Sequence, residues 1–238
     1  MMSQNLRQSI QRQSERYRIS SSKKDKKEIQ RLEKVLTAEN RFCNLDFNLY
    51  QIDFSAMGAS FATEFYNKAT MEAIQCVIEK IIQGGGSFMS KEEQLHRWFQ
   101  PTHKIGQVTA FGQAFTTDVG RLDDFVILKV PNNGAIAELI HEYVVGAYGT
   151  NKLRGIVPNF AYVLGIFSCS SPILDIFGNV VSWCMYNSLT QYLVYENIWP
   201  SVSLAEYTAR CTQDEFLNIY LQVLYALREA YKRIGFTH

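Results

Sequence analysis

The sequence predicts an α+β fold, in which helices precede and follow a group of short strands. Three observations carry this prediction. Apolar residues recur at helical spacing as far as Pro101, and from Thr102 the pattern changes to short extended runs. Near the C-terminus a long amphipathic pattern begins at a Thr-x-x-Glu capping signal at Thr212 and ends at Gly235, which predicts a long final helix.

The composition indicates a globular protein. The chain has 238 residues, of which 47% are hydrophobic and 13% aromatic, enough to bury a core. No run approaches eighteen apolar residues and the N-terminus lacks the apolar part of a signal peptide, so we expect a soluble intracellular protein without a membrane span. Five cysteines, odd in number and far apart, predict reduced thiols rather than a disulfide framework or a zinc site.

Charge divides the chain. Residues 1–41 carry 11 Lys/Arg and 5 Asp/Glu, a net charge of +6, whereas the remainder carries 13 and 18, a net charge of −5. We therefore expect a basic arm over 1–41, a helical extension over 42–101 and a third unit over 102–238. The arm is either a solvated tail that docks through one short helix or a segment that binds nucleic acid or an acidic protein surface.

Two helices are predicted in the extension. An apolar stripe predicts the first over Phe61–Gln83, ended by the three glycines at 84–86. These glycines lack the preceding strand and the following Lys-Ser/Thr pair of a phosphate-binding loop. A Ser-x-x-Glu capping box begins the second helix, over Ser90–Phe99. His96 and His103 have no partner Cys or Glu on the same face, so we predict no metal site.

The next elements are strands. Short extended runs lie at Ile105–Val108 and Gly112–Thr116, and a turn over Asp118–Asp124 leads into a buried-looking strand, Phe125–Pro131. Lys129 lies inside that strand, and a lysine among Val, Ile and Leu is costly to bury without a partner. It lies either on the solvent face of an edge strand or in a cleft, facing an anionic ligand and a carboxylate.

A helix and two more strands follow. The apolar spacing of Ile136–Tyr148 predicts an amphipathic helix that presents Glu138 and Glu142 on one face. Strand-like runs lie at Phe160–Phe167 and Gln191–Ile198, and we interpret the residues between them as a packed connector.

This order of elements resembles the small lobe and the beginning of the large lobe of a protein kinase. Val126-Ile127-Leu128-Lys129 is similar to the V-A-I-K strand of that family, and Phe111-Gly112-Gln113-Ala114 to the end of its glycine-rich loop. The loop departs from the family pattern, because Gln107 and Thr109 stand at the first two glycine positions and Gly106 is one residue early. We therefore expect a lid that is stiffer, or that binds phosphate less closely.

Four further motifs lie between the lysine strand and the C-terminus: His141-Glu142-Tyr143-Val144-Val145-Gly146, Asn151-Lys152-Leu153-Arg154, Pro158-Asn159-Phe160 and Tyr195-Glu196-Asn197-Ile198. By these motifs the chain resembles more closely the kinase-like proteins of large double-stranded DNA viruses. The resemblance covers about residues 105–238 and implies a location in the host cytoplasm or the virion.

The resemblance implies an ATP site. Lys129 would hold the ATP phosphates and pair with a helix carboxylate, for which Glu142 is our choice and Glu138 the rival. The loop over the phosphates would be formed by Gly106, Phe111, Gly112 and Ala114.

On the adenine side, Tyr195 would be the bulky residue at the back of the nucleotide pocket. Glu196, Asn197 and Ile198 would form a hinge whose backbone groups bond the adenine edge. The alternative for Glu196 is an exposed strand end.

The kinase pattern is incomplete. In a kinase the turn after the long helix carries His-x-Asp, then an Asn and later Asp-Phe-Gly, whereas Gly235-Phe236-Thr237-His238 stands at the position matching that His. The Mg²⁺ that the resemblance implies thus lacks its usual ligands, and we predict that this chain alone does not assemble the reaction centre.

Three functions follow. The first is a Ser/Thr protein kinase whose C-terminal part is missing here, the second a catalytically inactive kinase-derived structural or scaffold protein, for example of a virus particle, and the third a nucleotide-binding pseudoenzyme. Since most of a large lobe is missing, the apolar face of the long helix needs a cover. We expect it from a C-terminal segment, from a partner protein, or from the helices predicted over 61–83 and 90–99.

Overall fold

The computed structural model describes residues 68–83, 90–132, 135–186, 190–199 and 201–236. The predicted arm, the first part of the predicted helix over 61–83 and the three glycines at 84–86 lie outside these ranges. The elements, in chain order, are α4 (Lys68–Gln83), α5 (Lys91–Trp98), β1 (Phe99–Ile105), β2 (Gly112–Val119), β3 (Leu122–Pro131), α6 (Ile136–Tyr148), the short 3₁₀ helix η2 (Thr150–Leu153), β4 (Val163–Cys169), β5 (Ile173–Leu174), β6 (Val180–Ser182), β7 (Thr190–Glu196), α7 (Leu204–Thr208) and α8 (Gln213–Ile234).

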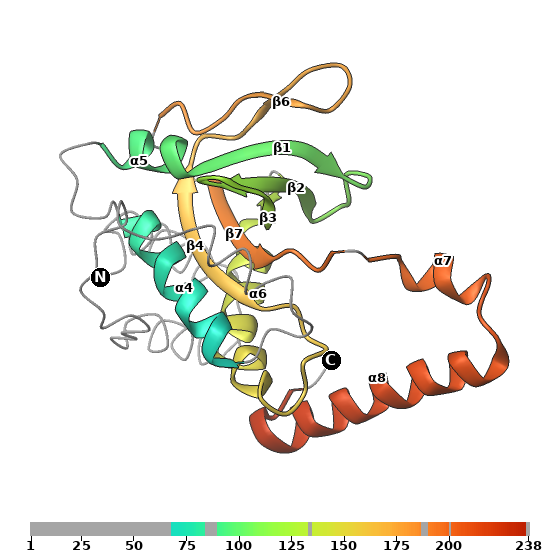
Figure 1. The fold of residues 1–238 in the computed structure, drawn as a ribbon. Coiled ribbons are helices and arrows are strands. Elements are labelled where there is room, and N and C mark those ends of the chain that lie inside the picture. The colour runs from blue at the N-terminus through green and yellow to red at the C-terminus, as the bar shows by residue number, and fades with distance from the viewer. Residues whose placement is uncertain (1–67, 84–89, 133–134, 187–189, 200, 237–238) are drawn as a thin grey trace, which may run out of the picture.

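The fold is α+β, built on a five-stranded antiparallel sheet of order β1-β2-β3-β7-β4 (Figure 1). The first three strands are joined as consecutive hairpins. The chain then leaves the sheet through α6 and returns to the opposite edge as β4, before β7 inserts between β3 and β4. Because of this insertion, β7 is an inner strand, next to the edge strand β4, and its C-terminal end lies next to the first half of β3.

Helices cover both faces of the sheet (Figure 1). The larger hydrophobic core lies between the sheet and α4 and α5, and includes Phe115, Leu128 and Tyr192. The smaller core lies between the other face and α6, where Leu139 and Val144 pack against Leu193 of β7. Alternation along β3 places Val126, Leu128 and Val130 in the larger core and Ile127 and Lys129 on the α6 side.

Two glycines let helices approach β4 closely. A Cβ added to Gly165 of β4 would lie 2.7 Å from Ile82 Cδ1 of α4. On the opposite face, a Cβ added to Gly146 of α6 would overlap with the side chain of Val163 in β4. The edge strand is therefore held between two helices by contacts that only glycine permits.

The helix predictions from local signals are confirmed. The Ser90–Glu93 capping box begins α5, and the Thr212–Glu215 box begins α8, which ends at Gly235 in the left-handed region with φ 65°. The helix predicted over Ile136–Tyr148 has the same bounds in the structure.

The strand boundaries differ from the prediction. β1 begins at Phe99, directly after α5, so that Gly106–Phe111 form the connection that was predicted in part as strand. Only Gly120 and Arg121 separate β2 from β3, so the turn predicted over Asp118–Asp124 was too long. Gly120 has φ 62°, a value that favours a tight hairpin turn.

The prediction of reduced cysteines was wrong. Cys169, the last residue of β4, is disulfide-bonded to Cys184, with the two Cα atoms 5.1 Å apart. The disulfide encloses the β5–β6 hairpin, so the segment predicted as a packed connector contains a two-stranded sheet of its own. The buried side of this segment carries Trp183 at 5% exposure, whereas Ile176 and Phe177 at the hairpin tip are 92% and 82% exposed.

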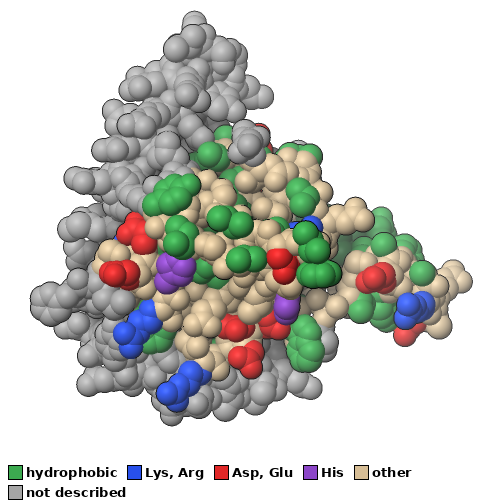
Figure 2. Space-filling model, turned by 90° about the horizontal axis from the view of Figure 1, so that it is seen from above, with side chains coloured by type: hydrophobic (Ala, Val, Ile, Leu, Met, Phe, Trp, Pro, Cys, Tyr) green, Lys and Arg blue, Asp and Glu red, His purple; other side chains and the backbone are tan. Residues whose placement is uncertain are grey.

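The long helix α8 projects from the rest of the molecule (Figures 1 and 2). Among the described residues, the last turns of α8 pack on the body, where Ala226 and Ala230 meet Leu153 and Val157 near η2. We expected the extension helices to cover its apolar residues, but the described helices α4 and α5 pack on the sheet instead. The apolar side chains that consequently stay at least 44% exposed on α8 are Phe216, Leu217, Tyr220, Leu221, Val223, Leu224, Tyr225 and Tyr231.

Within the described part of the chain, no helix is both long enough and apolar enough to cross a membrane.

Candidate functional site

A cavity of about 560 Å³ lies between the loop joining β1 and β2, strand β3 and helix α6. Three residues predicted for the nucleotide site line it: Phe111, Lys129 and Glu142. Glu138, the rival carboxylate, lines it as well. The other lining residues, which the sequence did not single out as site residues, are Thr109, Ala110 and Leu139.

An ion pair spans the base of this cavity. Lys129 Nζ of β3 lies 2.6 Å from Glu142 Oε2 and 2.8 Å from Oε1 of α6. The side chains are 27% and 37% exposed, so the pair is partly open to solvent. Of the two interpretations of Lys129, the structure thus shows the one in which it faces a carboxylate in a cleft. Glu142, rather than Glu138, is the carboxylate that bonds it.

Tyr195 is a second partner of the Glu142 carboxylate. It lies opposite Ile127 in the β3–β7 register, on the face of the sheet that α6 covers, and its hydroxyl donates a hydrogen bond to Glu142 Oε1. Burial raises the pKa of the Tyr195 hydroxyl above its ordinary value, and the bonded Glu142 carboxylate raises it further. The tyrosine therefore stays a neutral donor that holds one oxygen of Glu142 while Lys129 bonds both.

The loop above the cavity is held by Thr109. Its hydroxyl accepts hydrogen bonds from the backbone N–H groups of Phe111 and Gly112, at 3.3 and 3.2 Å, and donates to the Gly112 carbonyl at 3.0 Å. Asn132 bonds the Thr109 carbonyl from the far end of β3. Two N–H groups that a glycine-rich loop could offer to phosphate thus already have an acceptor.

The other predicted loop residues lie apart from the cavity lining. Gly106 is exposed, with φ 62°, at the beginning of the loop. Ala114 pairs with Lys129 in the β2–β3 register, and a Cβ added to Gly112 would overlap with the Val130 carbonyl. Gly112 and Ala114 therefore bring β2 close to β3 beside Lys129.

The predicted hinge follows β7. The Glu196 side chain is only 4% exposed and forms an ion pair with Arg154, so the alternative of an exposed strand end is wrong for this residue. The Asn197 side chain donates a hydrogen bond to the Asp124 carbonyl at the beginning of β3. Ile198 is 51% exposed. None of these three side chains lines the cavity around Lys129.

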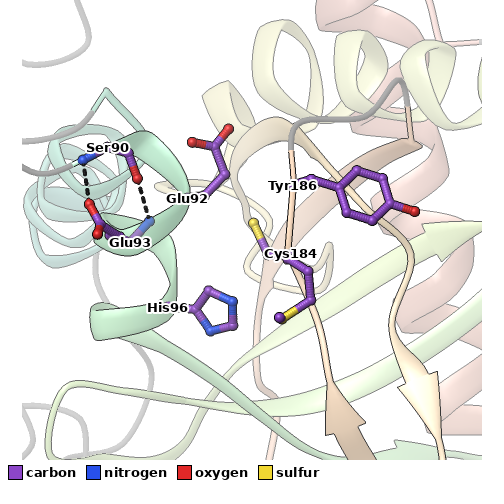
Figure 3. A pocket seen from close by; sticks show the side chains of 7 residues that line it. Ser90, Glu92, Glu93, His96, Cys184 and Tyr186 are labelled. Carbon is purple, nitrogen blue, oxygen red and sulfur yellow. Dashed lines mark hydrogen bonds between the residues drawn. The ribbon is translucent and has the colours of Figure 1, made fainter.

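A second cavity, of about 430 Å³, lies between α5 and the residues after β6 (Figure 3). Ser90 and Glu93 line it but are bonded to each other in the capping box. His96, which also lines it, contacts the Trp183 ring, with ring centroids 5.4 Å apart. Ser90 and Glu93 thus serve the beginning of α5, and His96 packs on Trp183.

The described residues do not offer a metal site. They contain no group of three or more His, Cys, Asp or Glu side chains arranged to hold an ion. At the cavity, Glu142 is bonded by Lys129, which leaves Glu138 as the remaining carboxylate of the lining. The Mg²⁺ that accompanies ATP in kinases does not fit this donor set.

Comparisons of the chain with protein-family models, with curated proteins and with solved structures found no match.

Proposed function

We propose that this chain binds ATP, with the triphosphate in the cavity at Lys129 and the adenine at residues 196–198. The observation that carries the proposal is the 2.6 Å ion pair between a lysine of the third strand and a glutamate of the following helix. Protein kinases require this type of pair to place the ATP phosphates. Both residues of the pair line the cavity, so an anion bound in it could approach the Lys129 ammonium group.

The ammonium group of Lys129 is the group of the cavity lining that could bind a phosphate, whereas Glu138 and Glu142 are both carboxylates. A partly exposed lysine that already has a carboxylate partner can still donate its remaining hydrogens to an anion. The second carboxylate, Glu138, opposes an anion, so binding depends on Lys129. Because the N–H groups of Phe111 and Gly112 bond Thr109, the lysine supplies most of the phosphate recognition in this proposal.

Phosphoryl transfer to Ser or Thr of a protein is the activity that the kinase resemblance implies. It needs metal-binding carboxylates and a base for the attacking hydroxyl. Since the described residues do not provide the metal ligands, we limit the proposal for these residues to nucleotide binding. Transfer would require groups supplied from elsewhere, in this chain or in a partner.

Thermal unfolding of the full chain tests the proposal. Trp98 and Trp183 are buried in the larger core and Trp199 is exposed, so the change in tryptophan fluorescence comes mainly from unfolding of that core. ATP with Mg²⁺ at one hundred times its Kd would add about 2.7 kcal/mol, which raises the Tm by roughly 5–10 °C. We expect Lys129→Ala to abolish this rise. Lys104→Ala, on strand β1 and outside the cavity lining, is the matched control and should keep it.

Two results of this experiment would contradict the proposal. No rise of the Tm at millimolar ATP, or an equal rise for wild type and Lys129→Ala, would contradict ATP binding at this cavity.

The exposed side chains of α8 favour a second candidate function, a catalytically inactive kinase-derived scaffold within a larger assembly such as a virus particle. A contiguous apolar surface of this kind is typical of an interaction site. For this function we expect no ATP effect on the Tm. We also expect a Leu221→Ser, Leu224→Ser variant to melt like wild type but to lose incorporation into the assembly.

A further inference from the structure

The most deeply buried ion pair of the described chain joins Arg154 to Glu196. The two contacts are parallel, Nη1 to Oε1 and Nη2 to Oε2, each at 2.7 Å, and the side chains are 6% and 4% exposed. This two-bond geometry matches the planar guanidinium to the planar carboxylate and fixes the orientation of both groups. The pair lies outside the cavity at Lys129.

Arg154 connects three segments of the chain. Besides Glu196, its Nη1 donates to the carbonyl oxygens of Pro158 and Phe160, at 3.3 and 3.1 Å. Glu196 in turn accepts a hydrogen bond from the Tyr162 N–H at 3.0 Å. One guanidinium group thus joins the end of η2, the loop that leads to β4, and the last residue of β7.

The same contacts fix the backbone at the beginning of the hinge. The Glu196 N–H donates to the Tyr162 carbonyl at 2.9 Å, on the side where its carboxylate meets Arg154. At the next residue, the Asn197 side chain is bonded to the Asp124 carbonyl. Two consecutive hinge residues are therefore held by the protein itself, one from the α6–β4 connection and one from the sheet. A recognition element held in this way loses little conformational freedom when a ligand binds.

We propose that Arg154 is a positioning residue for adenine recognition. It does not touch the nucleotide, but through its bonds to Glu196 it fixes the backbone at the beginning of residues 196–198, where the proposed function places the adenine. This inference rests on the proposed ATP site and extends it, because it assigns base recognition and phosphate recognition to two separate ion pairs. Lysine cannot replace arginine here, since a single ammonium cannot make two parallel bonds to Glu196 and also reach two carbonyl oxygens.

The experiment compares two probes on the full chain, ATP and inorganic tripolyphosphate, both with Mg²⁺, by calorimetric titration at 10 °C. Tripolyphosphate tests the cavity at Lys129, and the ratio of the two affinities tests the hinge. The variants are Arg154→Lys and Glu196→Gln, which keep charge or shape, with Arg228→Lys on α8, 57% exposed, as the matched control.

We expect wild type and Arg228→Lys to bind ATP more tightly than tripolyphosphate. Arg154→Lys and Glu196→Gln should keep the tripolyphosphate affinity and bind ATP about tenfold more weakly, the effect of one misplaced hydrogen bond to the base. A change in overall stability alone would weaken both probes together. The affinity ratio therefore separates a positioning role from a structural one.

Other outcomes decide between the two proposals. If wild type binds neither probe, the ATP site itself is wrong. If wild type binds both probes equally, or if the folded variants keep the wild-type ratio, the phosphate site stands and the role of Arg154 is wrong. Unfolding of both conservative variants at 10 °C would also count against it, because the ion pair would then support the whole fold rather than the hinge.

Discussion

Two ion pairs involve residues of strands β3 and β7, and they differ in their exposure to solvent. Lys129–Glu142 lies at the cavity, with side chains 27% and 37% exposed, and shares a carboxylate oxygen with Tyr195. Arg154–Glu196 is 6% and 4% exposed, and backbone groups of the β4 connection occupy its remaining hydrogen-bonding positions. The first pair can rearrange when an anion enters the cavity, whereas the second is part of the packed interior.

This difference predicts different roles. A partly exposed pair contributes little to stability, because water screens it and competes for its groups. A buried pair is costly to break, because removal of one partner leaves the other charge without solvent or counter-ion. We therefore expect changes at Lys129 to affect ligand binding first and changes at Arg154 to affect the free energy of unfolding first.

The largest expected effect is that of Arg154→Ala. It leaves the Glu196 carboxylate buried without its cation, which should lower the free energy of unfolding by about 3–5 kcal/mol. Denaturation in urea, followed by tryptophan fluorescence, measures the loss. Arg228→Ala, at an exposed pair, should change stability by less than about 1 kcal/mol. A loss below 1 kcal/mol for Arg154→Ala would show that the two ion pairs do not differ as their burial predicts.

A second change tests whether the Lys129–Glu142 pair depends on the close packing of α6 against β4. In Gly146→Val the new side chain would overlap with Val163, so α6 must move away from β4. Overpacking of this kind lowers stability by about 1–3 kcal/mol. Because α6 carries Glu142, we also expect weaker ATP binding.

The matched control for this change is Gly155→Ala, where the nearest atom to an added Cβ is Lys68 Cδ at 3.8 Å. It should keep both the stability and the ATP affinity of wild type. Equal effects of the two glycine replacements would contradict the packing argument.

The third carboxylate to compare is that of Glu79, which is bonded by the amide of Gln75 and not by a cation. Burial raises the pKa of Glu79 from 4.5 to about 7, against the opposing effect of its hydrogen bond from Gln75. The folded state thus binds the proton more tightly than the unfolded chain does. Its stabilising contribution is complete below pH 4.5 and is lost as the pH rises through 7.

Melting curves of wild type and Glu79→Gln between pH 4.5 and 8 measure this contribution. Wild type should lose about 1 kcal/mol more than the variant over that interval, after allowance for solvent screening. Identical pH profiles would show that Glu79 titrates as an ordinary exposed carboxylate.

The smallest expected effect on stability is that of Lys129→Ala. The pair is partly exposed, so the free energy of unfolding should change by less than about 1 kcal/mol, although ATP binding is lost. Urea denaturation without nucleotide measures this value directly. A loss above 2 kcal/mol would place Lys129 with Arg154 as a structural residue.

The parts of the fold that follow local rules were predictable from the sequence. The capping boxes at Ser90 and Thr212 and the apolar period of Ile136–Tyr148 act within a few residues, and the structure has these helices where they were predicted. The same period placed both Glu138 and Glu142 on one face, and the choice of Glu142 as the partner of Lys129 came from the motif that carries the viral resemblance. The structure shows Glu142 bonded to Lys129.

The parts that depend on long-range pairing were not predictable. The β4–β7 pairing and the β5–β6 hairpin bring Cys169 next to Cys184, although 15 positions separate them in the sequence. Likewise, Arg154 and Glu196 meet only because β7 inserts beside β4. The sequence analysis placed Arg154 in a motif, but the sequence alone could not identify Glu196 as its partner. Neither pair has a spacing that identifies it.

The apolar side chains of α8 affect how unfolding of this protein can be followed. Dyes such as ANS fluoresce when they bind exposed apolar surface, and their signal is commonly taken as a sign of a loosened core. The native chain already offers such a surface along α8. ANS should therefore fluoresce with the folded protein, and its signal would report on α8 while the sheet stays intact. Trp98 and Trp183 lie inside the core of the sheet, so the change in tryptophan fluorescence on unfolding comes mainly from this core, whereas Trp199 is 80% exposed in the native chain.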